Sequence, residues 1–202
     1  MSAAAAIKEK EKAFSAGLKV VAVAFLFAAC GALSSYWLLP DFPDRWELLF
    51  PLPFALLCTV VFMRKAEAVL AIALAEMVWL ISSFAAHALG MWTNLSPLPG
   101  FGGGLVGGLG LVVFAAICHP YMSSLKRLAY GGLIGSLTGL AFTPWTHIYM
   151  VQHYGSNINR AFPKTVPILA FAVWQAAMGT YLYVIVGRPA RSRTLQDSSE
   201  VL

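Results

Sequence analysis

The chain has 202 residues, of which 59% are hydrophobic and only 11% are charged. Soluble domains carry about a quarter charged residues, so this composition argues against a water-soluble domain and indicates an integral membrane protein. The formal net charge of +5 does not indicate a nucleic-acid partner, because the basic residues are scattered at the edges of apolar segments. The partner that the composition predicts is the lipid bilayer.

Six apolar runs predict an all-α integral membrane protein with six transmembrane helices, since each run approaches the roughly 20 residues that a span needs. We expect residues 1–16 to form a polar cytoplasmic segment, 17–187 the transmembrane domain and 188–202 a flexible cytoplasmic tail. The predicted helices cover about residues 17–39, 47–63, 66–89, 98–118, 127–145 and 166–187.

The distribution of basic residues predicts the direction of these helices. With six spans, eleven of the fourteen lysines and arginines fall on the side of the two termini, and only Arg45, Arg160 and Lys164 fall on the other. Cytoplasmic loops are enriched in lysine and arginine, so both termini are predicted to be cytoplasmic. The three cysteines lie in separate apolar segments and form neither a zinc motif nor a disulfide framework.

The third predicted helix carries an acid inside an apolar run, LAIALAEMVWLISSFAAH, residues 70–87. An ionised acid facing lipid at mid-span costs about 2.5–3.5 kcal/mol on insertion scales. Glu76 should therefore face protein or water, or hold a proton. At 100° per residue, Ser83 and His87 return to nearly the same helix face, so a polar stripe is predicted from mid-membrane toward the outer surface.

Gln175 in the sixth predicted helix lies at a depth similar to that of Glu76. One interpretation is a hydrogen bond between the two helices, worth about 0.6–2 kcal/mol, that fixes their register. The other is a proton or cation site on a transport path, the usual reason for an acid within a span. The continuation of the stripe to Ser83 and His87 favours the second interpretation.

Glycines spaced for helix contact predict that the fourth and fifth helices form a close-packed antiparallel pair, because small residues let backbones approach closely in lipid. The glycines assigned to the contact faces are Gly100, Gly103, Gly104, Gly107 and Gly108 in the fourth helix and Gly131, Gly135 and Gly139 in the fifth. An alternative interpretation makes residues 99–110 an unwound or re-entrant segment that lines a pathway.

A second candidate site lies in the long outer connection, where His147, Tyr149, His153 and Arg160 could form a pocket. The two histidines are six residues apart, which does not align them on a helix. Metal or haem ligation normally shows a closer pair, or two histidines at matched depth on facing helices. The sequence therefore identifies no particular metal or cofactor.

No catalytic signature such as HExxH or GxSxG is present, so the sequence does not support an enzyme. The leading hypothesis is a small transporter, channel or coupling subunit that uses the Glu76 stripe. One alternative is a non-catalytic subunit or assembly factor of a larger membrane complex, with other membrane subunits or further copies of itself as partners. The other is a membrane-embedded protein that binds a lipid, a quinone or haem. We expect a prokaryotic inner membrane as its location, with an endomembrane as the alternative.

Overall fold

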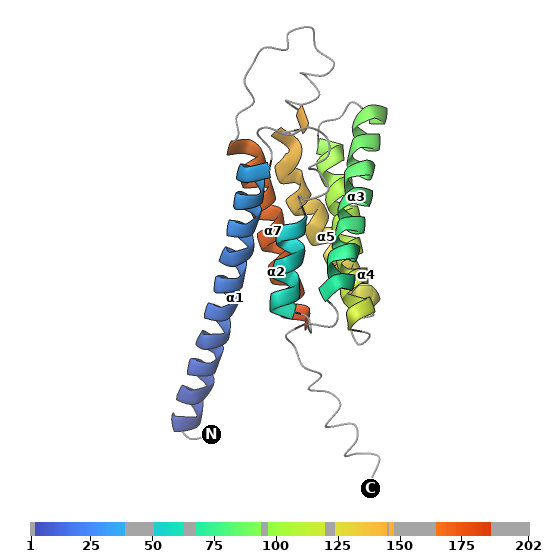
Figure 1. Cartoon of the computed structure of the whole chain (residues 1–202). Coiled ribbons are helices and arrows are strands. Elements are labelled where there is room, and N and C mark those ends of the chain that lie inside the picture. The colour runs from blue at the N-terminus through green and yellow to red at the C-terminus, as the bar shows by residue number, and fades with distance from the viewer. Residues whose placement is uncertain are drawn as a thin grey trace.

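The computed structural model describes residues 3–38, 51–62, 68–93, 97–119, 124–144, 146–147 and 165–186. These residues are helical almost throughout and contain no strand, which confirms the all-α prediction for this part of the chain. The elements are α1 (Ala3–Leu38), α2 (Leu52–Phe62), α3 (Ala68–Thr93), α4 (Pro97–Cys118), α5 (Leu125–Gly139), the 3-10 helix η4 (Leu140–Phe142) and α7 (Thr165–Val186). Figure 1 shows them as one bundle, with α1 at one side and α3 at the other.

Four helices are long and apolar enough to cross a membrane, which supports an integral membrane protein. The four candidate spans are Lys10–Tyr36, Ile72–Gly90, Pro97–Cys118 and Val166–Val186. By contrast, α2 has only 11 residues. At 1.5 Å per residue it covers about 16 Å, roughly half of the 30 Å hydrocarbon thickness.

The first helix begins well before the predicted boundary at residue 17 and is continuous over 36 residues. Alanine, lysine and glutamate favour helix, and the segment before Gly17 contains neither proline nor glycine to stop it. Figure 1 shows the N-terminal part of α1 extending beyond the other helices at the lower end of the bundle, the end at which α1 begins and α7 ends. The polar N-terminal segment is thus a helical extension of the first span.

The glycine-rich segment is an uninterrupted helix, so the re-entrant alternative for residues 99–110 is wrong in this structure. Pro97 and Pro99 fall in the first turn of α4, where a backbone N–H has no partner within the helix and proline is tolerated.

Glycines on one side of α4 meet the backbone of α5. A methyl group on Gly104 would overlap the carbonyl oxygen of Gly135, and one on Gly100 would overlap that of Gly139. Gly108 stands in the same relation to Gly131, so the two helices run antiparallel with backbones in contact. Helices can approach this closely only where both carry no side chain at the crossing.

Glycines on a second side of α4 meet α3. A methyl group on Gly103 would come within 3.2 Å of the Ser82 carbonyl oxygen, and one on Gly110 within 2.8 Å of the Val78 side chain. Gly107 faces the hydroxyl of Ser82 in the same way. Helical spacing predicts Gly103 and Gly107 on the face that holds Gly100 and Gly104, but the structure places Gly103 against α3 and Gly107 between Ser82 of α3 and Trp174 of α7.

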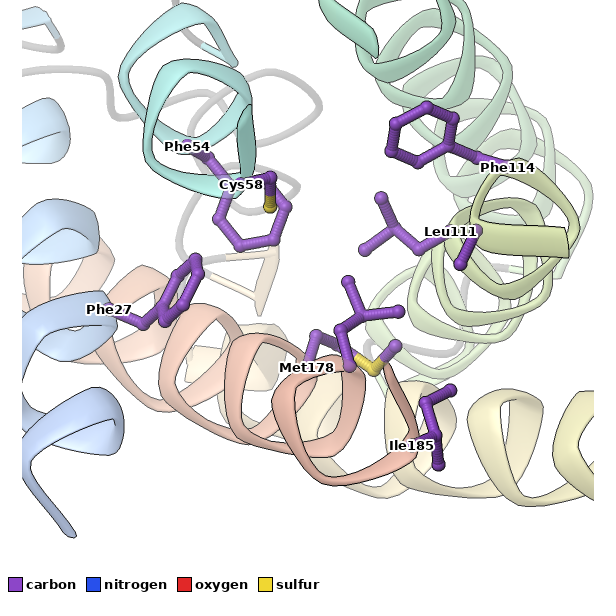
Figure 2. Close-up of a cluster of buried hydrophobic side chains, with 9 residues drawn as sticks. Phe27, Phe54, Cys58, Leu111, Phe114, Met178 and Ile185 are labelled. Atoms are coloured by element: carbon purple, nitrogen blue, oxygen red, sulfur yellow. The ribbon is translucent and has the colours of Figure 1, made fainter. Parts of the chain in front are cut away.

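The buried core joins α1, α2, α4 and α7. Figure 2 shows Phe27 and Phe54 on one side of Met178, with Leu111 and Phe114 on the other. The Phe27 and Phe54 ring centroids are 5.4 Å apart. Phe27 also packs over Gly179 of α7, where a methyl group would overlap the ring, so α1 is held to α7 by a large side chain placed over a glycine.

We expect Gly104→Ala to lower the free energy of unfolding by about 1–3 kcal/mol, because the added methyl group cannot fit against the α5 backbone. Gly17→Ala is the matched control, since nothing lies within 4 Å of that position. It should leave the stability unchanged or raise it by up to about 1 kcal/mol, because alanine favours helix. Thermal unfolding of both variants in detergent, followed by circular dichroism, measures the difference. Equal melting temperatures would contradict the α4–α5 contact.

Candidate functional site

Most described serine and threonine hydroxyls in the helices are satisfied within their own helix. Ser34 donates to the Cys30 carbonyl at 2.8 Å and Ser136 to the Gly132 carbonyl at 2.8 Å, each four residues back. Such bonds satisfy a hydroxyl where no water competes.

Among the residues that the structure describes, four buried side-chain atoms have no hydrogen-bond partner. They are Oε2 of Glu76, Nε1 of Trp174, Oε1 of Gln175 and Oγ1 of Thr180. A buried polar atom without a partner costs about 1–3 kcal/mol, so each such atom calls for an explanation. Glu76 and Gln175 are residues that the sequence singles out, and Trp174 and Thr180 are not.

Glu76 lies in the lower half of α3. The helix continues to Thr93 and not only to residue 89, so Glu76 is about four residues below its midpoint. It sits about 12 Å along the axis from Ala68, at 1.5 Å per residue. The residue is half-buried beside the buried Ala75, and its Oε2 atom is shielded from solvent without a hydrogen bond.

Ser83 and His87 continue the stripe along α3, but both side chains are exposed on the surface of the bundle. Figure 1 shows α3 at the side of the molecule, with the short α2 beside its lower part. The upper part of the stripe therefore faces away from the described helices. It does not line a path enclosed between them.

Gln175 is 97% buried, because its exposed fraction is 3%. It lies one helical turn from both Phe171 and Gly179, and both of these contact α1. This places Gln175 on the side of α7 that faces α1. Since neither Glu76 Oε2 nor Gln175 Oε1 has a partner, the amide of Gln175 donates no hydrogen bond to Glu76 Oε2.

Contact between α3 and α7 runs through aromatic rings instead. Trp79 and Phe171 have ring centroids 5.7 Å apart. Trp174 of α7 packs elsewhere: its ring centroid lies 6.0 Å from that of Phe54 in α2. Its indole also lies beside Gly107 of α4, which has no side chain to occupy that space. A signal for Trp174 exists in the sequence: most of the tryptophans lie near predicted span ends, where membrane proteins concentrate them, whereas Trp174 lies in mid-span.

The outer pocket falls mostly outside the described residues. Of its four candidates, Tyr149, His153 and Arg160 lie there, and His147 is an exposed residue after η4. Within the described ranges, no three histidine, cysteine, aspartate or glutamate residues are grouped so as to hold a metal ion.

No protein-family model, curated protein or solved structure matches this chain.

The unpaired Oε1 atom of Gln175 generates a prediction for stability. Gln175→Met keeps the side-chain volume and removes a buried acceptor that lacks a donor, so the free energy of unfolding should stay the same or rise. Met178→Gln, one turn away at a position with 0% exposure, is the reverse control. It should lower the free energy of unfolding by about 1–3 kcal/mol. Denaturation in mixed detergent micelles measures both, and a loss of stability in Gln175→Met equal to that of Met178→Gln would show that Gln175 has a partner.

Proposed function

We propose that the chain crosses the membrane six times, with both termini in the cytoplasm. The glycine contacts pair α3, α4 and α5 in alternating directions, and α1 runs antiparallel to α7 in the same way. Figure 1 places the start of α1 and the end of α7 at the same end of the bundle. The start of α5, with Lys126 and Arg127, lies at that end too, which agrees with the excess of basic residues expected on the cytoplasmic side.

In this arrangement α2 and α5 complete the count although neither is a full-length apolar span by itself. α2 contacts α1, α3 and α7, and α5 contacts α4 and α7. The ends of a short helix carry unpaired backbone groups, which neighbouring helices can shield from lipid.

A topology experiment tests the six-span arrangement. Protease-cleavable tags are fused to the two ends of the chain, and sealed inside-out and right-side-out vesicles are compared. We expect both tags to be cut in inside-out vesicles and neither in right-side-out vesicles, because six crossings return the chain to its starting side. Tags cut in opposite vesicle preparations would require an odd number of crossings.

We propose further that the protein is a small transporter, channel or coupling subunit that moves protons or cations through Glu76. The observation that carries this proposal is the shielded, unpaired Oε2 atom of Glu76 inside the candidate span Ile72–Gly90. Acids within spans are costly and mark ion paths or proton relays by default. An oxygen that no protein donor occupies can accept a proton or bind a cation without first breaking a bond within the protein.

The second candidate function is that of a non-catalytic subunit or assembly factor. The exposure of Ser83 and His87 favours it, because polar side chains in a span usually face protein or a water-filled cavity. The two functions are compatible if the ion path runs along the contact between α3 and a neighbouring subunit.

Glu76→Gln tests the transport proposal. The variant keeps the shape of the side chain but can neither bind nor release a proton, so flux should fall to the level of protein-free vesicles. Proteoliposomes with an internal pH-sensitive dye and an imposed membrane potential measure proton flux, and cation-sensitive dyes measure the alternative. Glu11→Gln, the same change at an exposed site near the start of α1, is the control and should retain wild-type flux. Unchanged proton and cation flux in Glu76→Gln would exclude the role of Glu76.

A further inference from the structure

We propose that a second copy of this chain packs against the polar stripe of α3, so that Ser83 and His87 of one copy meet Ser83 and His87 of the other. This inference rests on the proposed membrane topology, and it names the partner of the site that contains Glu76. It follows from three features of α3: where its polar side chains point, how they can pair, and what surrounds them.

The outward direction of the stripe sets α3 apart from α4 and α7. Every exposed side chain described in α4 and α7 is apolar: Pro97, Phe101, Val113, Ile117, Leu169 and Val173. In α3, by contrast, Ser83 is exposed well within the candidate span Ile72–Gly90, and His87 is exposed three residues before its end. Lipid tails offer no hydrogen bonds, so polar groups in spans pair with other helices.

The chemistry of the stripe fits a copy of itself better than a charged partner. A serine hydroxyl, a neutral imidazole and a protonated carboxyl group each carry both a donor and an acceptor. Where the two-fold axis runs along the two helices, residues next to the axis meet their own counterparts, which requires groups that can pair with themselves. Ser83 and the neutral form of His87 meet this requirement, and no lysine or arginine lies in the candidate span.

The surroundings of the stripe leave room for a second copy. Leu80 and Phe84, next to the stripe, are exposed by 46% and 76%. α4 and α2 are the helices with which α3 makes most of its contacts, and Figure 1 shows α2 beside only the lower part of α3. Two copies inserted in the same orientation and related by an axis along the membrane normal bring residues of equal depth together. The apolar flanks then pack around the central polar pairs.

Cysteine cross-linking in native membranes tests this contact directly. Cys30, Cys58 and Cys118 are first replaced by alanine, and Ser83→Cys or His87→Cys is then added. Oxidation with copper phenanthroline and air should give a disulfide-linked band at twice the mass of one chain. Leu137→Cys, an exposed position on α5, is the matched control and should stay at the mass of one chain. A monomer band alone, equal cross-linking of Leu137→Cys, or a product of another mass would overturn the proposal.

A second measurement uses no cysteine. Single-molecule photobleaching in liposomes should show two fluorophores per particle for the wild-type chain. The double variant Ser83→Leu and His87→Leu should associate roughly 3- to 30-fold more weakly for each hydrogen bond lost. An unchanged dimer fraction in a variant with a wild-type circular dichroism spectrum would also overturn the proposal.

These results are separable from those of the transport assay. Cross-linking through Ser83→Cys together with unchanged flux in Glu76→Gln would keep the dimer and remove the transport role. Glu76-dependent flux without any cross-linked product would keep the transport role and remove the dimer.

Discussion

Direct contact between helix backbones along α4 is the constraint on which the rest of the bundle depends. α4 presents Gly104 to the Gly135 carbonyl oxygen of α5, and it presents Gly103 to the Ala86 side chain and the Ser82 carbonyl oxygen of α3. In water, each glycine within a helix costs about 1 kcal/mol relative to alanine. In lipid the helix persists, because no water is available to take over its backbone hydrogen bonds. The position of α3, and with it of Glu76, follows from the glycines of a different helix.

The polar atoms of the spans divide into two groups. Hydroxyls such as those of Ser34 and Ser136 donate hydrogen bonds to carbonyls of their own helix, so they require no partner on another helix. The four shielded atoms without partners all belong to α3 and α7, among the described residues. Because α7 also carries much of the buried core, replacing its polar groups tests both packing and chemistry. On α3, Ser83 and His87 of the polar stripe are exposed. Substitutions of these two residues should therefore change the chemistry of the stripe with less effect on folding.

The sequence predicts the helical segments well and their neighbours less well. Long apolar runs identify where helices lie, since burial in lipid requires helix, and the described helices fall within or overlap all six predicted segments. The predicted segment 47–63 is the shortest of the six, and α2 occupies only Leu52–Phe62 within it. Helical spacing groups Gly103 with Gly104, but only the assembled bundle decides that one meets α3 and the other α5. The sequence predicts that Gln175 lies at the depth of Glu76. It does not predict the order of the helices around the bundle, which places Gln175 on the side of α7 that faces α1.

α1 is one unbroken helix that joins the charged N-terminal turns to the buried core. With 36 residues at 1.5 Å each, it is about 54 Å long, nearly twice the hydrocarbon thickness. It has no proline at which to bend. Its charged N-terminal turns and the Phe27 ring that packs on Gly179 therefore belong to one continuous helix. A change in the tilt of the N-terminal turns would therefore act on the core at Phe27.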